Sequence, residues 1–385
     1  MQQPIIAPRF EGVARLLAEA TEQDPNHRAQ LAVYLRGEPV LDLAVGEGMD
    51  TGQLHGVFSV SKGLSSLVFA KLIQDGLVDP AAPVAQYWPE FAAAGKGEVT
   101  VEQLLSHQAG LPGPVNGLDM DDFLESRPAA AILAALAPQW TPGVAFGYHA
   151  LTFGTFIEEL VLRITGRRVQ ELYEEWIRVP AEADAWLGLP EEQEARYVPV
   201  PSVGGMGFVD PFGLSGLSMN SISGFLDADG QRSYDLMQVP NLRRVREIGP
   251  AAVGGVASAR GLARAYAYAT TGLRRADGSL TAPLLSAATM AEVSRDRVFG
   301  LDRISGNMKA FGVGFMRPNP NNDWGSAAAF GHDGANGTVS FADPGWGLTF
   351  AYLPFTPQDG GRNGCVAQRL TVAVREAILA QLAAG

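Results

Sequence analysis

Residues 59–62 read Ser59-Val60-Ser61-Lys62, which places a serine three residues before a lysine at the start of a helix-like apolar run. On a helix, side chains three positions apart share one face and lie about 5–6 Å from each other. The amine of Lys62 can therefore reach the hydroxyl oxygen of Ser59, and a neutral amine there would take its proton. The spacing predicts an activated serine nucleophile.

The run that follows Ser59 is apolar nearly all round a helix. One stripe at helical spacing holds Val60, Leu64, Leu67, Val68 and Leu72, and Phe69 and Ile73 fall on the side of Lys62. Because a helix of this kind is buried, the sequence predicts that Lys62 points into the protein. A buried lysine is paired or neutral, and burial lowers its pKa. Two alternatives stay open, namely a side chain that reaches the surface and one that pairs with a carboxylate.

Composition bounds the class of protein. The chain has 385 residues, 46% of them hydrophobic, which suffices for two domains or for one large domain with an insertion. Its net charge of -12 argues against nucleic acid and anionic membranes as partners. No apolar stretch reaches the ~20 residues that span a bilayer, and residues 1–4 lack the features of a secretory signal.

The numbers and positions of cysteine and histidine residues limit which kinds of site the protein can contain. The single cysteine, Cys365, excludes an intrachain disulfide and fits a reducing cytoplasm. The five histidines are scattered without metal-binding spacing, so we expect neither a metal nor a cofactor. The phosphate-binding loop and the Gly-x-Ser-x-Gly turn are both missing from the sequence, which removes the main support for phosphate-loop enzymes and α/β-hydrolases.

Periodicity predicts an α+β fold. An amphipathic helix is expected over 10–21, a hairpin over 30–35 and 39–45, and further strands over 338–342 and 348–353. Other helices are expected over 101–106, 120–137, 151–165, 259–271 and 366–382, and residues 199–240 read as a long loop region. We therefore predict one antiparallel sheet built from both ends of the chain, with domains at 1–78 plus 252–385 and a mostly helical insertion at 79–251.

Two further motifs follow the serine motif. The first is Trp140-Thr141-Pro142-Gly143 leading to Tyr148-His149-Ala150, and the second is Gly331-His332-Asp333-Gly334-Ala335-Asn336-Gly337. The flanking stretches 104–111 and 253–258 fit the same pattern. Because the motifs occur in this order, the chain resembles the serine β-lactamase/penicillin-binding superfamily. It resembles most closely the esterase branch of that superfamily, the family VIII carboxylesterases, which are related to class C β-lactamases. The resemblance implies a β-lactamase/DD-peptidase-like fold.

The resemblance also implies roles for particular residues. Ser59 would be the nucleophile that forms an acyl-enzyme, and Lys62 and Tyr148 would share the general-base role, each lowering the pKa of the other. Which of the two holds the proton stays open. The backbone amides of Ser59 and Ala335 would form the oxyanion hole.

The remaining residues of these motifs receive weaker assignments. Gly331, Gly334 and Gly337 suit a strand along which the substrate passes. His332 would contact the substrate or tune Tyr148. His107 is expected to be a scaffold residue, and His149 either supports the site or is merely packed.

Departures from the β-lactamase pattern point to esters as substrates. The family's Tyr-x-Asn is Tyr148-His149-Ala150 here, and its Lys-Thr-Gly is His332-Asp333-Gly334. In the lactamases, the asparagine holds the acylamido group and the lysine helps to recognise a carboxylate, whereas Ala150 and a neutral His332 do neither. We expect a carboxylesterase that hydrolyses a small-molecule, short-chain ester. The alternatives are a β-lactamase or D-amino-acid peptidase, an acyltransferase of the same fold, and a non-catalytic penicillin-recognising protein.

Overall fold

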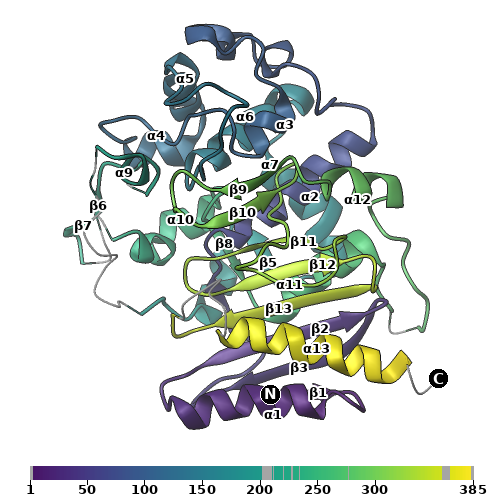
Figure 1. Ribbon diagram of the computed structural model, residues 1–385. Helices are drawn as coiled ribbons and strands as arrows, with labels where there is room; N and C mark the ends of the chain where they lie inside the picture. Colours follow the sequence, from purple (N-terminus) through teal and green to yellow (C-terminus); the bar gives the residue numbers. More distant parts are fainter. Residues whose placement is uncertain are drawn as a thin grey trace.

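A six-stranded antiparallel sheet forms the base of the molecule, in the order β1-β3-β2-β13-β12-β11 (Figure 1). The computed structural model describes residues 3–201, 210, 212–219, 221–226, 229–233, 235–275, 277–357 and 365–382. The strands of this sheet are β1 (Ile5–Ile6), β2 (Ala29–Leu35), β3 (Glu38–Val45), β11 (Phe330–Asp333), β12 (Val339–Asp343) and β13 (Leu348–Pro354). Since β2 pairs with β13, the two ends of the chain meet at the centre of the sheet, as the sequence predicts.

Each face of the sheet is covered by helices. Helices α1 (Glu11–Gln23) and α13 (Val366–Leu382) pack together over one face (Figure 1). Val33 and Phe350, which pair across β2 and β13, point into the core on that side. Their neighbours Ala32 and Ala351 point to the other face, where their small side chains admit α11 (Ala259–Thr270). The alternation along the strands is that of a sheet buried on both faces.

Helix α2 (Val60–Gln74) carries the Ser59 motif and lies at the centre of the molecule. It is buried along most of its length, as its apolar sequence predicts. The contact between α2 and α11 is close at Gly63, where a Cβ atom would lie 2.1 Å from the hydroxyl oxygen of Tyr266. A side chain at this position would collide with Tyr266, so glycine permits the close approach of α2 to α11.

The helical region lies on the far side of α2 from α1 and α13 (Figure 1). It contains α3 (Val101–Leu105), α4 (Met120–Glu125), α5 (Arg127–Ala135), α6 (Thr152–Thr165), α7 (Val169–Tyr173), α8 (Val179–Ala181), α9 (Leu214–Met219) and α10 (Arg243–Ile248). Shorter helical segments are η1 (Val84–Gln86), η2 (Pro89–Gly95), η3 (Glu174–Arg178), η4 (Glu191–Arg196) and η5 (Leu236–Asn241), of which η3 is a π-helix and the others are 3-10 helices. A small sheet, ordered β4 (His55–Gly56), β8 (Gly255–Ala257) and β5 (Ala185–Leu187), connects this region to α2.

Several sequence predictions of elements are wrong. The single helix expected over 120–137 is two helices, because Ser126 has a φ of 64° and Pro128 begins a new first turn. The hairpin of β9 (Val298–Leu301) and β10 (Met308–Phe311) was not expected, nor was α12 (Ala287–Val293). The two-residue strands β6 (Phe225–Leu226) and β7 (Arg232–Ser233) pair within 199–240, which was expected to be a loop.

The glycine-rich third motif is also only partly a strand. Strand β11 ends at Asp333, and the chain then turns into β12, with the amide of Gly334 donating to the carbonyl of Thr338 at 2.7 Å. Gly337 in this turn has a φ of 92°. Part of the loop expected over 199–240, namely 202–209, 211, 220, 227–228 and 234, lies outside the described residues. The domain boundaries stay a prediction.

The described residues include no helix that combines the length and the apolar character needed to cross a bilayer.

Candidate active site

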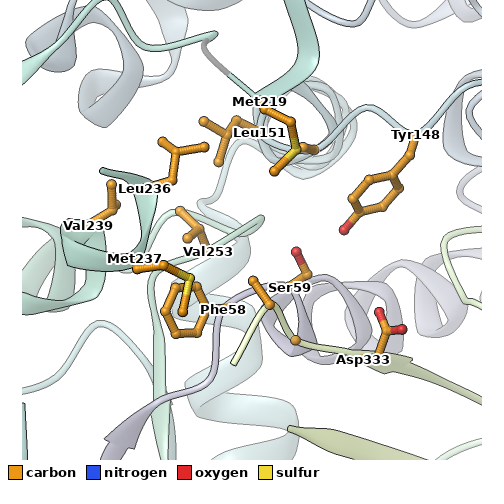
Figure 2. A pocket seen from close by; sticks show the side chains of 13 residues that line it. Phe58, Ser59, Tyr148, Leu151, Met219, Leu236, Met237, Val239, Val253 and Asp333 are labelled. Atoms are coloured by element: carbon orange, nitrogen blue, oxygen red, sulfur yellow. The ribbon is translucent and has the colours of Figure 1, made fainter. Parts of the chain in front are cut away.

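Ser59 stands at the first turn of α2, after a strained residue. Phe58 has a φ of 49°, which is unusual for a residue with a bulky side chain. This backbone conformation changes the direction of the chain immediately before α2 begins. The hydroxyl of Ser61 donates to the carbonyl of Phe58 at 2.5 Å and accepts from the amide of Gly255 at 2.8 Å. These two bonds tie the turn to β8, so that the half-buried Ser59 projects into the cavity shown in Figure 2.

Lys62 is fully buried and lies next to the nucleophile. Its Nζ is 3.0 Å from Ser59 Oγ and donates to the carbonyl of Ala252 at 3.0 Å. Burial lowers the pKa of Lys62 well below its usual value, with the charge of Asp333 opposing and that of Lys309 adding to the shift. A neutral amine at this distance has a free electron pair with which it can take the serine proton.

Tyr148 approaches Ser59 from the opposite side of the cavity, with its phenol oxygen directed at the serine (Figure 2). Its ring centre lies 5.1 Å from Lys62 Nζ. Burial raises the pKa of Tyr148, and the hydrogen bond with Ser59 lowers it only in part. The expectation that the phenol and the amine lower each other's pKa is therefore wrong for Tyr148, because its burial outweighs the neighbouring groups. The raised pKa keeps the phenol of Tyr148 protonated, and the lowered pKa of Lys62 favours the neutral form of its amine.

Two residues that the sequence did not point to hold the backbone of Tyr148. Asp302, in the β9–β10 turn, accepts from the amide of Tyr148 at 3.0 Å, and Ser218 of α9 donates to its carbonyl at 2.5 Å. Ser218 also accepts from the amide of Ala150 at 3.0 Å. Tyr148 is thus fixed on both sides of its Cα by side chains from distant segments.

Ala335 lines the same cavity as Ser59. Within the described part of the chain, the amides of Ser59 and Ala335 have no hydrogen-bond acceptor. The turn that carries Ala335 is held by Asn336, whose side chain donates to the carbonyl of Gly56 at 3.3 Å. A Cβ atom on Gly334 would lie 2.7 Å from the carbonyl oxygen of Val57, so glycine permits this close approach. Two unpaired amides facing one cavity can stabilise an oxyanion.

His332 lies next to the catalytic residues but outside the cavity. His332 is buried with 1% of its surface exposed, and its Nδ1 lies 2.7 Å from the carbonyl oxygen of Asp333. It does not line the catalytic cavity, so substrate contact by His332 is not supported; its ring centre lies 6.0 Å from that of Tyr148. Burial lowers the pKa of His332 to about 3, which keeps the ring neutral.

His107 and His149 shape the Tyr148 loop. His107 packs edge-on against the Tyr148 ring, at 5.1 Å between ring centres, and its Nδ1 accepts from the amide of His149 at 3.2 Å. His149 Nε2 accepts from the amide of Leu111 at 2.9 Å. Burial lowers the pKa of both rings, so they act as neutral scaffold groups.

Two charged side chains lie near the nucleophile. Asp333 lines the cavity; burial opposes the ionised form of its carboxyl, but the charge of Lys309 and a hydrogen bond from Asn322 outweigh the burial and lower the pKa of Asp333. Lys309 of β10 has its Nζ 5.7 Å from the Tyr148 ring centre. The third motif therefore contributes a negative charge, whereas the nearby positive charge comes from a hairpin that the sequence did not reveal.

The cavity beside Ser59 has a volume of about 190 Å³ and a mostly apolar wall (Figure 2). Its apolar lining consists of Phe58, Ala150, Leu151, Met219, Leu236, Met237, Val239 and Val253. Four of these residues come from the segment 199–240, which the sequence predicts to be a long loop region. In the described part of the chain, no group of three or more His, Cys, Asp or Glu side chains is placed to hold a metal ion.

The phenol of Tyr148 can be removed without disturbing its packing. Because the ring stacks on Phe311, with 6.1 Å between centres and 8° between planes, Tyr148→Phe keeps this contact. We expect kcat to fall by about 10²–10⁴-fold, the usual contribution of a positioned proton donor or acceptor, with KM within about threefold. Steady-state hydrolysis of p-nitrophenyl butyrate measures both constants. A variant that keeps more than half of the wild-type kcat would rule out a proton-transfer role for the phenol.

The chain is similar to known proteins over most of its length. A family profile described as Beta-lactamase matches residues 13–367. "Esterase/beta-lactamase LipL" of Mycobacterium tuberculosis is 32% identical over 362 residues, which are 90% of this chain and 81% of that protein. The structure of EstA from Arthrobacter nitroguajacolicus Rue61a is similar with a TM-score of 0.92 and 45% identity, over 98% of this chain and 99% of that chain. A family VIII carboxylesterase is similar with a TM-score of 0.82 and 31% identity, over 97% and 99%.

Proposed function

Because the chain belongs to the beta-lactamase family and is a serine hydrolase, we propose that it is a carboxylesterase that hydrolyses short-chain esters through an acyl-enzyme on Ser59. The observation that carries the proposal is the 3.0 Å separation of Ser59 Oγ and the Nζ of the buried Lys62, whose pKa is lowered by burial, beside a small apolar cavity. Similarity to EstA and to a family VIII carboxylesterase supports the ester as the bond that is cleaved.

The proposed reaction begins with proton transfer from Ser59 to Lys62 as the serine oxygen attacks the ester carbonyl. The amides of Ser59 and Ala335 stabilise the negative oxygen of the tetrahedral intermediate. Lys62, now an ammonium, returns the proton through the phenol of Tyr148 to the departing alkoxide, which leaves as an alcohol. Water then attacks the acyl-enzyme with the same groups acting in reverse, and releases the carboxylic acid.

The walls of the cavity favour neutral, short acyl groups. Its volume of about 190 Å³ lies below the roughly 300–1,000 Å³ of pockets that enclose drug-sized ligands, which suits a small acyl chain. Asp333 replaces the third-motif lysine's neighbour with a negative charge beside the site, and its carboxylate is paired with Asn322 rather than offered to a substrate. Ala150 lacks the amide that would hold an acylamido group, and the neutral His332 lacks a charge that would attract an anion.

Hydrolysis of β-lactams is the second candidate activity. The name of the relative LipL joins esterase and beta-lactamase, and that protein is 32% identical to this chain. The same acyl-enzyme would form on Ser59 with a lactam. The difference between the two activities lies in the recognition of the substrate's carboxylate and acylamido groups, for which Asp333 and Ala150 are unsuited.

A substrate panel tests the proposed function. We expect kcat/KM on p-nitrophenyl esters to be largest between acetate and hexanoate and to fall at least tenfold at dodecanoate, because the cavity cannot enclose the longer chain. We expect kcat/KM for nitrocefin to be at least 100-fold lower than for the best ester. Nitrocefin turnover equal to ester turnover would make the lactam the better substrate assignment, and a folded protein active on neither would exclude both activities.

We also propose that the enzyme works in the cytoplasm on a small-molecule ester, without nucleic acid or membrane partners. The net charge of -12 and the single cysteine support this assignment. Fractionation of the native host, with detection by antibody, tests the location.

A further inference from the structure

The segment 249–253 joins α10 to β8 and touches the catalytic site twice. The carbonyl of Ala252 accepts a hydrogen bond from Lys62 Nζ at 3.0 Å. Val253, the next residue, lines the catalytic cavity. The position of this short segment therefore determines where the lysine amine points and how one wall of the cavity is placed.

The same segment is held from its other side by two polar side chains. Glu158 of α6 accepts from the amide of Ala251 at 2.7 Å through its Oε1. The same oxygen accepts from Gln170 Nε2 at 3.2 Å, and Gln170 Nε2 also donates to the carbonyl of Gly249 at 3.1 Å. Glu158 and Gln170 thus bind the segment at its first and third residues, immediately before the carbonyl that Lys62 uses.

We propose that Glu158 is a positioning residue for Lys62, which acts through Ala251 and Ala252 to hold the amine within reach of the Ser59 hydroxyl. This inference rests on the proposed function in so far as it assigns Lys62 as the base. Glu158 does not line the catalytic cavity, and its influence therefore passes through the backbone. Misplacing a catalytic group by about 1 Å can cost 10²-fold in rate, so a segment that shifts slightly has a large effect.

A second cavity gives solutes access to Glu158. It has a volume of about 680 Å³ and shares no lining residue with the catalytic cavity. Its wall includes Glu158, Gln170, Leu162, Val169, Arg168 and Ile248. A small carboxylate that entered this cavity in a variant without the Glu158 side chain would find the amide of Ala251 and the side chain of Gln170 unpaired.

Substitution at Glu158 with chemical rescue tests the proposal. We expect Glu158→Ala to lower kcat for p-nitrophenyl butyrate at least tenfold with KM within threefold, because the acceptor for Ala251 is lost. Glu158→Gln keeps an acceptor oxygen and should retain at least a third of the wild-type kcat. Formate at about 100 mM, at ionic strength held constant with chloride, should raise the kcat of Glu158→Ala at least threefold and leave the wild type unchanged.

Control variants separate positioning from general damage to the cavity. Leu162→Ala enlarges the same cavity and keeps the hydrogen bonds of Glu158 and Gln170 to the 249–253 segment, and should show wild-type kcat and no effect of formate. If Glu158→Ala does not fold, Gln170→Ala removes the bond to Gly249 while the carboxyl remains, and should lower kcat at least threefold. Two results would overturn the proposal. The first is a wild-type kcat in Glu158→Ala or, if that variant does not fold, in Gln170→Ala. The second is a folded, impaired Glu158→Ala whose kcat is restored neither by formate nor by glutamine at position 158.

A second readout keeps this inference distinct from the proposed function. The rate at which a fluorophosphonate probe labels Ser59 depends on the serine and its base but not on ester turnover. We expect this rate to be lowered in Glu158→Ala and near wild type in Glu158→Gln. If the wild type labels but hydrolyses no ester, the proposed substrate is wrong, while the labelling rates of the variants still decide the role of Glu158.

Discussion

Ser59→Ala is expected to abolish measurable ester turnover, with a fall in kcat of about 10⁴-fold or more, because no other group can form the acyl-enzyme. The serine is half-buried, and its removal frees space in a cavity rather than in the core. The free energy of unfolding should therefore stay within about 1 kcal/mol of the wild type. Steady-state kinetics and denaturant unfolding measure the two quantities on one preparation.

Ser65→Ala is the matched control for this substitution. Ser65 lies on the same helix, and its hydroxyl donates to the carbonyl of Lys62 at 3.0 Å, away from the catalytic cavity. This variant should keep its kcat within about threefold. Residual turnover of Ser59→Ala above about 1% of the wild type, once contaminating activity is excluded, would mean that another group attacks the ester.

Lys62→Met is expected to lower kcat by about 10³-fold or more and to leave the protein as stable as the wild type, or more stable, at pH 7. The activity falls because the base is lost. The stability argument follows from the lowered pKa of the buried amine. Below the unfolded-state pKa, the unfolded chain binds a proton that the folded state resists, so Lys62 costs stability as pH falls toward its folded pKa. Methionine removes this cost and fits the apolar surroundings.

The pH dependence of the wild type follows from the same group. Since protonated Lys62 cannot accept the serine proton, kcat/KM should fall as pH drops through the lowered pKa of Lys62. Lys71→Met is the control, because Lys71 pairs with Asp75 at the surface of the same helix. It should change neither kcat nor the acid limb of the profile. A Lys62→Met variant with wild-type kcat would remove the lysine from the mechanism.

The sequence predicts those parts of the fold and the site that depend on the spacing of residues close together in the chain. The apolar periodicity of residues 60–74 predicts a buried helix, and the three-residue spacing predicts the meeting of Ser59 and Lys62. The strand-like runs at both ends of the chain likewise predict one antiparallel sheet built from both ends, and the structure adds that β2 pairs with β13. In each case, short-range periodicity carries the information.

The residues that sequence did not reveal act through contacts between distant segments. Asp302 is 154 residues from the amide of Tyr148 that it binds, and Glu158 is 93 residues from the amide of Ala251. Lys309 lies on a hairpin whose first strand is partly exposed and contains Gly300, which weakens its strand signal. The break at Ser126 differs from these cases, because Pro128 in the first turn of α5 is a local signal for a helix boundary that a single helix over 120–137 leaves out of account.

The covalent intermediate tests the central claim most directly. Wild-type protein mixed with excess p-nitrophenyl butyrate, quenched in acid during turnover and digested, should yield the peptide containing Ser59 with the mass of one added butyryl group. Fragmentation should place the group on the Ser59 hydroxyl, and the same peptide from Ser59→Ala should carry none. Ester turnover with no butyryl group on Ser59, or with the group on another residue, would contradict the account.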